Sequence, residues 1–292
     1  MKFASAPTRL FVCLLLTLMT GGCFSTQMMV RQMYPLMEEM SAAVHRNPDI
    51  EMVRDAFPAN LIQLDGLIEV SPDNTDLLLM AAEAYCGYSF SFIEGQDRER
   101  AKYLYRKARD YALRVLFKEK RFRKAWKGNV DQFTAALREL HPGHVPALFW
   151  ASNSWLSLAG LSLDNPETFL DLPKIEAMMN RVIELDETFY YGATHAGLGA
   201  YHASRSKTNG GDPEKARYHF DRAFTISKGK LLAVHLLYAK YYSYQIQDRE
   251  LYLKTLAQVI NSPEDILPEQ ALANAVARRK ADRMIEEVDE LF

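Results

Sequence analysis

Apolar residues recur with helical periodicity along most of the chain. The stretch DPEKARYHFDRAF, residues 212–224, shows the pattern: Ala216, Phe220 and Ala223 share one helical stripe, and charged residues separate them. An aspartate followed by Pro213 is typical of a helix start. Two small residues on either side of a large one indicate that a neighbouring helix packs closely against this stripe. The segment is therefore predicted to be the second helix of a helical hairpin.

The same register recurs elsewhere. If Ala216, Phe220 and Ala223 occupy positions 20, 24 and 27 of a tetratricopeptide repeat, each first helix should place apolar or small residues at its positions 4, 7, 8 and 11. Four segments do so: Leu78, Ala81, Ala82 and Tyr85; Leu148, Ala151, Ser152 and Trp155; Ala193, Ala196, Gly197 and Ala200; and Val234, Leu237, Tyr238 and Tyr241. Two further second helices fit, with Ala101, Tyr105 and Ala108 and with Ile175, Met179 and Val182.

These repeats predict an all-α fold. One hairpin cannot bury its apolar stripe alone, so stacked hairpins are expected to form an α-solenoid of degenerate, hidden tetratricopeptide-like repeats with a concave face. The last stretch, PEQALANAVARRKADRMIEEVDELF, is amphipathic and charged and is predicted to be a C-terminal capping helix. An irregular bundle of the same helices is the alternative.

The N-terminus has the features of a secretion signal. Lys2 and Arg9 precede the apolar stretch LFVCLLLTLM, which is too short to span a bilayer as a helix. The residues TGGC follow it. This arrangement resembles a bacterial lipobox, so Cys23 is predicted to be lipidated. Thr20 departs from the leucine that is usual there, and ordinary signal-peptidase cleavage near Gly22 is the alternative.

The N-terminus also sets the expected location and domain division. Phe24 in place of aspartate after the cysteine predicts sorting to the outer membrane, with the protein anchored on the periplasmic side. We expect a signal peptide at 1–22, a lipidated segment and first helix at 23–50, and a repeat domain at 51–292.

Composition excludes some function classes and gives no sign of catalysis. The net charge is −2, and neither a long run of one sign nor a basic patch is evident, so no nucleic-acid partner is expected. The sequence lacks G-x-S-x-G, H-E-x-x-H and G-x-x-x-x-G-K-[ST] motifs. His195 and His202 are two helical turns apart, too far to share one ion. We therefore predict no enzyme activity, cofactor or metal, and a core position for Cys86.

The repeat register predicts a ligand-binding or partner-binding face. Positions 2, 5, 9 and 12 of each first helix should face the concave surface, and here they are apolar or aromatic with a few polar groups. The candidate binding residues are Glu83, Phe149, Trp150, Asn153, Tyr201, His235 and Tyr242. Glu83, Asn153 and His235 would supply directional contacts. The alternative is that loops and the C-terminal helix fill the concavity.

The order of several stretches resembles the TatT family, tetratricopeptide lipoproteins associated with TRAP transporters. They are FPANLIQLDGLIEVSPDN, LLLMAAEAYCGYSFSFIE, AKYLYRKARDYALRVL, ALFWASNSWLSLAGLSLDNPE and GGDPEKARYHFDRAF, with DELF near the C-terminus. The resemblance covers roughly residues 35 to 292. It implies a non-enzymatic periplasmic protein that works beside the solute-binding subunit of a TRAP transporter, which captures organic acids or other apolar-tailed anions. It also implies a homotrimer with ligand-sized channels.

Two functions follow. In the first, the chain docks a periplasmic TRAP solute-binding protein and helps handle a small hydrophobic or organic-acid ligand. The small residues of 193–200 would then leave an open channel. In the second, the chain is a non-catalytic tetratricopeptide scaffold for outer-membrane protein assembly, which needs no internal cavity.

Overall fold

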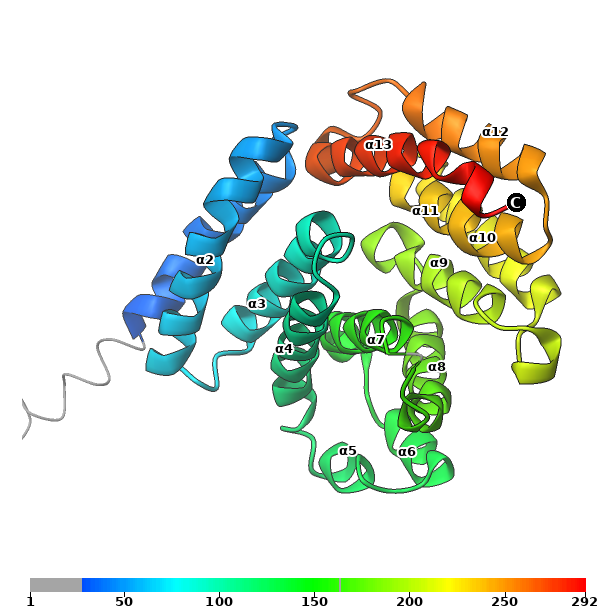
Figure 1. Ribbon diagram of the computed structural model, residues 1–292. Coiled ribbons are helices and arrows are strands. Elements are labelled where there is room, and N and C mark those ends of the chain that lie inside the picture. The colour runs from blue at the N-terminus through cyan, green and yellow to red at the C-terminus, as the bar shows by residue number, and fades with distance from the viewer. Residues whose placement is uncertain (1–27, 163) are drawn as a thin grey trace, which may run out of the picture.

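The computed structural model describes residues 28–162 and 164–292 (Figure 1). Within these ranges the chain folds into helices joined by turns, and no strand is present. The prediction of an all-α fold is confirmed. Cys23 and the signal segment lie outside the described residues, so the predictions about them stay predictions. No helix in the described part is both long and apolar enough to cross a membrane.

The helices follow one another as stacked antiparallel hairpins (Figure 1). A helix over 28–45 pairs with α2 (Ile50–Val70). The predicted hairpins follow: α3 (Thr75–Tyr88) with α4 (Arg98–Leu116), α7 (Val145–Gly160) with α8 (Glu167–Asp186), α9 (Phe189–Ala203) with α10 (Pro213–Ser227), and α11 (Leu232–Leu237) with α12 (Arg249–Ile260). The arrangement matches the predicted solenoid of hairpins.

The repeat register identifies the core. Ala216, Phe220 and Ala223 have no exposed surface, and α9 packs along them. The four predicted positions of α3 and of α7 are also buried. Burying a phenylalanine side chain contributes about 1.5–3 kcal/mol, so this stripe is a main source of stability in the α9–α10 hairpin.

Local capping defines the ends of α10. The Asp212 side chain accepts hydrogen bonds from the backbone N–H groups of Glu214 and Lys215, and Pro213 occupies the first turn. Such a cap stabilises a helix by about 1 kcal/mol. The helix ends at Lys228, which adopts a left-handed conformation with φ 54°. Asn74, Asp97 and Asp248 cap three other helices in the same way.

The last predicted first helix departs from the register. Val234 is buried, but the helix changes after Leu237 into a π-helical turn, η4 (Tyr238–Ser243). A π-turn adds a residue to the helical turn and rotates the side chains that follow. Tyr238 and Tyr241 are consequently half-buried, while Tyr242 lies in the core.

The small residues of α9 do not leave a channel. A Cβ atom added at Gly199 would lie 2.7 Å from the Phe220 ring, and one at Gly197 would lie 2.4 Å from the methyl group of Met179. Neighbouring side chains therefore occupy the space next to these glycines. The expectation of an open channel along 193–200 is corrected: small residues here allow close helix packing.

A short hairpin that the register did not predict lies between α4 and α7. It consists of α5 (Lys120–Ala125) and α6 (Val130–Leu137) and occupies the lower end of the molecule in Figure 1. Six of the ten residues in 118–127 are Lys or Arg, and all six side chains are exposed. The expectation that the protein has no basic patch is therefore wrong. The near-zero net charge of the whole chain hides this local cluster.

The C-terminal helix α13 (Ala271–Glu286) covers the last hairpin, as predicted for a cap. Asn274 is fully buried; its side chain accepts a hydrogen bond from the Leu232 backbone N–H and donates one to the Lys230 carbonyl. On its other side, Arg279 forms an ion pair with Glu51 of α2 at 2.5 Å. The first and last parts of the chain therefore meet, and the stack closes on itself (Figure 1).

Candidate functional site

The seven predicted binding residues do not form one surface. Four aromatic members lie in the core, with exposed fractions of 2% for Phe149, 6% for Trp150, 4% for Tyr201 and 8% for Tyr242. Their burial does not test whether they bind a ligand, so their binding role stays a prediction. It also shows that these four side chains pack in the protein core.

The other predicted residues fall into separate environments. The ring of His235 packs on Phe224, with centroids 4.7 Å apart, and its Nε2 atom lies 3.1 Å from the Gly229 carbonyl oxygen. Tyr201 donates a hydrogen bond to Glu176 at 3.0 Å. These contacts hold both side chains in local structural roles.

Glu83 and Asn153 lie closer together, because Asn153 contacts the turn of α3 that follows Glu83. The Asn153 amide donates to the sulfur of Cys86 at 3.7 Å, one turn beyond Glu83 on α3. The nearest basic group to Glu83 is the His45 ring, 3.8 Å away. The Glu83 side chain is 30% exposed, yet desolvation raises its pKa to about 7. Protein atoms therefore surround most of this carboxyl, while part of the side chain stays exposed.

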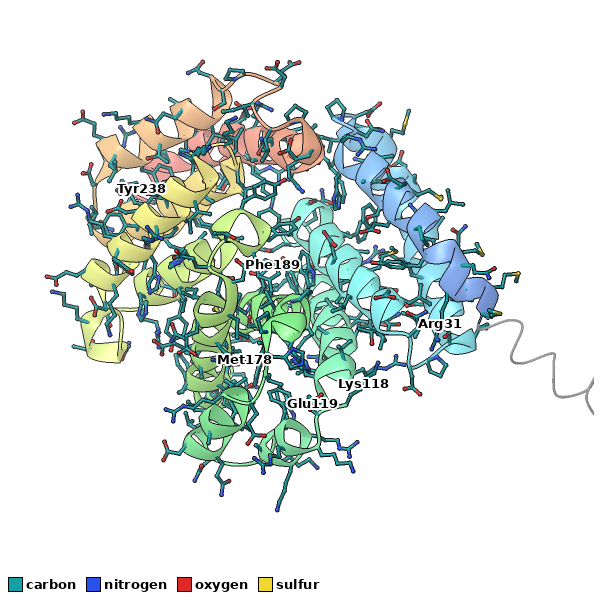
Figure 2. All side chains as sticks on the ribbon, turned by 180° about the vertical axis from the view of Figure 1, so that it is seen from behind. Arg31, Lys118, Glu119, Met178, Phe189 and Tyr238 are labelled. Atoms are coloured by element: carbon teal, nitrogen blue, oxygen red, sulfur yellow. The ribbon has the colours of Figure 1, made fainter. Side chains whose placement is uncertain are left out.

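The first turn of α9 contains Tyr190, which is close enough to Glu83 for their charges to interact. Tyr190, Tyr191 and Gly192 are consecutive left-handed residues, with φ values of 48°, 59° and 73°. The left-handed region costs roughly 1–2 kcal/mol for each residue that is not glycine, so two tyrosines in succession are strained. Phe189, which precedes them, lies near the centre of the molecule (Figure 2).

Aromatic packing holds the strained turn in place. The Tyr190 ring contacts Phe149 and Trp150, with ring centroids 5.4 and 5.2 Å apart. Burial raises the pKa of the Tyr190 hydroxyl well above its ordinary value, and the charge of Glu83 raises it further. Tyr190 and Glu83 are therefore neighbours. The buried rings of Phe149 and Trp150 hold Tyr190 in this position.

Two π-turns supply further residues. The turn η1 (Ser89–Ile93) extends α3 and carries Phe90, seven residues after Glu83 and thus on the same helical face. The turn η4 carries Lys240. Irregular turns of this kind are frequent at functional sites. Three departures from regular helix thus occur around one region.

Lys280 of α13 joins this region. Its ammonium group donates to the Phe90 carbonyl at 2.6 Å and lies 3.8 Å from the centre of the Phe90 ring. Desolvation lowers the pKa of Lys280 to about 8, partly offset by Glu94. Lys240 lies 3.7 Å from Glu94, which also accepts a hydrogen bond from Tyr105. Within the described residues, Lys280 forms no ion pair; its ammonium group contacts a carbonyl oxygen and an aromatic ring instead.

We give the name inner recess to five residues that interact in two sets, Glu83 with Tyr190, and Lys280 with Phe90 and Lys240. Phe90 and Tyr190 supply aromatic rings and Lys280 supplies an ammonium group without an ion pair, which together suit a small anion with an apolar tail. Of the seven binding residues predicted from the sequence, Glu83 is the one that belongs to this group. The other four gave no signal, because their positions depend on two π-turns, a strained turn and the docking of α13.

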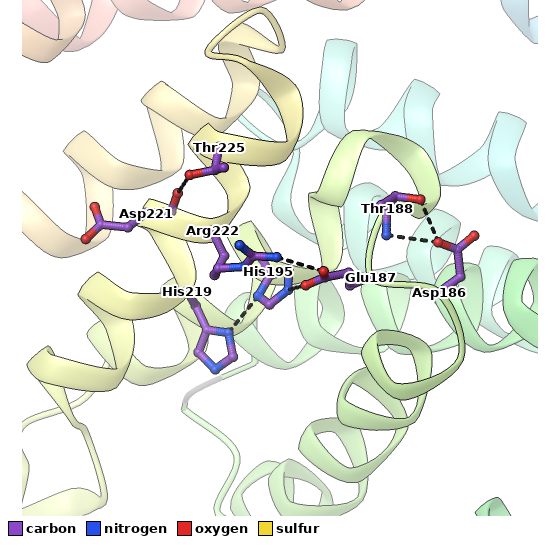
Figure 3. Close-up of polar contacts among 8 residues, drawn as sticks. All are labelled: Asp186, Glu187, Thr188, His195, His219, Asp221, Arg222 and Thr225. Atoms are coloured by element: carbon purple, nitrogen blue, oxygen red, sulfur yellow. Dashed lines mark hydrogen bonds and ion pairs between the residues drawn. The ribbon is translucent and has the colours of Figure 1, made fainter.

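A second polar cluster lies between α9 and α10 (Figure 3). Glu187 accepts a hydrogen bond from Arg222 at 2.7 Å and lies 3.3 Å from Nε2 of His195. The Nδ1 atoms of His195 and His219 are 2.9 Å apart, so one ring donates and the other accepts. The ring of His202 stacks on that of His219, with centroids 5.8 Å apart.

Burial sets the protonation of these histidines. Desolvation lowers the pKa of His195 and of His202, and it lowers that of His219 to about 4, with the neighbouring rings adding to the effect. Hydrogen bonding to Arg222 lowers the pKa of Glu187. The rings are therefore neutral at pH 7. No group of three or more His, Cys, Asp or Glu side chains in the described ranges has a metal-binding arrangement.

The fold defines a degenerate tetratricopeptide-like repeat protein. The chain belongs to the TAtT family, described as the TRAP transporter T-component, whose family model matches residues 46–292. This confirms the TatT resemblance and associates the chain with the TRAP transporter system. No curated protein matches the chain.

Proposed function

We propose that the chain docks the solute-binding subunit of a TRAP transporter and helps handle a small hydrophobic or organic-acid ligand. It acts on the periplasmic side of a bacterial membrane, anchored through Cys23, in the outer membrane. Family membership supports the TRAP association. The observation that carries the ligand role is the ammonium group of Lys280, which forms no ion pair within the described residues and lies over the Phe90 ring.

The recess supports a carboxylate ligand in particular. Lys280 is positively charged at neutral pH and would bind the carboxylate, while Phe90 and Tyr190 would contact an apolar tail. Desolvation raises the pKa of Glu83 to about 7, so at neutral pH about half of these carboxyls are protonated and do not repel that anion. No step in this role requires a bond to be made or broken, in keeping with a transport protein rather than an enzyme.

The helix over 28–45 supports self-association, including the homotrimer. Met29, Met33, Leu36 and Met40 are 57%, 41%, 59% and 60% exposed and follow the spacing of a coiled-coil seam. Terminal helices of a solenoid usually present a polar outer face. This outer edge is instead rich in methionine, and sulfur atoms are visible along it in Figure 2.

The direct test is binding between the purified chain and the TRAP solute-binding protein of the same organism, measured by biolayer interferometry. A micromolar or tighter dissociation constant is expected, as for transient complexes. If no binding is detected with the partner at about 100 μM, docking is not the function.

The scaffold function has one observation in its favour. Four of the aromatic side chains predicted for the concave face are buried, which leaves fewer apolar groups for a ligand. A scaffold would bind an extended protein segment, and apolar carboxylates would not compete with that segment.

A further inference from the structure

Residues 118–127, which include α5, form a dense cluster of positive charge in a protein whose net charge is −2. Residues 118–127 carry a net charge of +5, whereas the rest of the chain carries −7. The six cations are Lys118, Lys120, Arg121, Arg123, Lys124 and Lys127. All are exposed. This part of the surface therefore attracts negatively charged groups.

The hairpin is firmly held. Phe122 is 1% exposed, and its ring centroid lies 5.5 Å from that of Phe133 on α6. Trp126 packs on Trp155 of α7 at 4.8 Å. In addition, Lys174 donates to the Trp126 carbonyl. A six-residue helix is not stable alone, so this aromatic cluster fixes the basic side chains in one arrangement on the repeat stack.

Four of the cations have no partner of their own. Arg121 forms an ion pair with Glu139, and Lys118 donates to the Asp73 carbonyl and the Thr75 hydroxyl. Within the described part of the chain, the side chains of the others form no ion pair or hydrogen bond; they are Lys120, Arg123, Lys124 and Lys127. Their charge is not needed to hold the fold together.

The surface next to them is concave. A pocket of about 390 Å³ lies between the end of α4, α5 and the end of α6, and Phe122 and Leu140 are among its apolar lining residues. Glu119 and Glu139 lie at the same pocket among the cations. Lys118 and Glu119, at the start of this region, lie near each other in the lower half of the molecule in Figure 2.

We propose that the α5–α6 hairpin is an electrostatic docking surface for a protein with an acidic face. Resting on the proposed function, that protein is the TRAP solute-binding subunit. Charge complementarity of this kind speeds association and fixes the orientation of the complex.

The same surface fits an anionic membrane less well. Membrane-surface segments insert exposed aromatic or aliphatic side chains, but Phe122 points into the core and Trp126 is half-buried. Glu119 and Glu139 would be repelled by anionic head groups. In a protein complex, two carboxylates among the cations instead help to select one orientation.

The test compares three forms of the full chain, each binding to the solute-binding protein at 50 and 300 mM NaCl. They are the wild type, the hairpin variant K120E/R123E/K124E/K127E and a matched control, R106E/K207E/K230E/K254E. The control reverses four exposed cations on other elements, so its net charge equals that of the hairpin variant. Circular dichroism melting checks that all three are folded.

We expect the hairpin variant to bind at least about 10-fold more weakly than the wild type at 50 mM NaCl. The control should stay within about threefold of the wild type. High salt should weaken wild-type binding at least about 10-fold and should change binding of the hairpin variant much less.

Three results would overturn the proposal. If the wild type and the hairpin variant bind equally at both salt concentrations, the hairpin is not the docking surface, and the proposed docking function stands. If the wild type does not bind at all, both are wrong. If only the wild type binds phosphatidylglycerol vesicles, while both forms bind the protein partner equally, the hairpin is a membrane contact.

Discussion

The two halves of α9 differ in backbone conformation and in how they pack. From Ala196 onward the helix is regular, and its small residues let α10 approach until the Phe220 ring lies against Gly199. In the first turn, Tyr190 and Tyr191 take left-handed conformations that aromatic residues rarely adopt. The regular half gives stability through close packing. The strained half costs stability and places Tyr190 against the inner recess, which is where we propose that function lies.

The largest expected effect is in the regular half. Phe220→Ala should lower the free energy of unfolding by about 3–5 kcal/mol, because it opens a cavity where no side-chain surface is exposed. Urea denaturation monitored by circular dichroism measures this. Tyr218→Ala is the control: its side chain is 58% exposed on the same helix, and the change should stay within about 0.5 kcal/mol. Equal effects of the two substitutions would show that the repeat stripe is not the core.

The next-largest expected effect on stability comes from His195, His202 and His219, which lie beside that core. Their pKa values are lower in the folded protein than in the unfolded chain, mainly through desolvation. The unfolded chain therefore binds more protons between about pH 6.5 and pH 4, and stability falls as the pH falls through this range. The loss is on the order of 2 kcal/mol once partial solvent screening is allowed for.

The variant His219→Gln tests this origin. It removes the ring whose pKa is lowered to about 4, so the urea midpoint should depend less on pH between 6.5 and 4 than in the wild type. His141→Gln is the control, because His141 lies in an exposed turn. An unchanged slope in His219→Gln would locate the acid sensitivity elsewhere.

The third prediction concerns the inner recess, to which the strained half of α9 contributes Tyr190. Lys280→Met keeps the length of the side chain and removes its charge. Octanoate binding, measured by calorimetry, should weaken at least about 10-fold, or 1.4 kcal/mol, while the melting temperature changes little. Wild-type binding should also weaken above pH 8, as Lys280 loses its proton.

Two controls accompany that measurement. Lys254→Met removes an exposed cation on α12 and should bind octanoate like the wild type. Octanol has the same tail without the carboxylate, so its binding should not distinguish wild type from Lys280→Met. Unchanged octanoate affinity in Lys280→Met would remove this lysine from the ligand site.

The smallest effect concerns the strained turn itself. Gly192 has φ 73°, and an added Cβ atom would lie 3.0 Å from the Ile226 side chain. Gly192→Ala should therefore destabilise the protein by about 1 kcal/mol. Gly66→Ala is the matched control on α2, where the Cβ atom would meet no atom within 4 Å, and it should stabilise by about 0.5–1 kcal/mol. Stabilisation by both changes would mean that the turn carries no strain.

The same contrast explains what the sequence could predict. The stripe of Ala216, Phe220 and Ala223 is visible because helix packing requires apolar residues at fixed spacing. The turn at Tyr190 is invisible, because aromatic residues give no signal for a left-handed backbone. The α5–α6 hairpin was missed for another reason: its helices are short, and tertiary packing of Phe122 rather than helical periodicity holds them.

The candidate site was predicted only in part. Glu83 was found because the repeat register faces it inward. Lys280 was missed because a lysine on an amphipathic terminal helix is usually on the solvent side, and only the docking of α13 brings it to Phe90. Four aromatic side chains were predicted to form a binding surface, but they are buried; they are Phe149, Trp150, Tyr201 and Tyr242. The repeat register gives the direction of a side chain but not which neighbouring residues cover it.

The measurement that tests the central claim most directly is native mass spectrometry of the mature protein, purified gently in detergent, alongside its Lys280→Met variant. We predict a trimer in which the wild type carries an apolar organic-acid adduct and the variant has lost it. A monomer without any adduct in either form would contradict the account and favour a scaffold without a ligand.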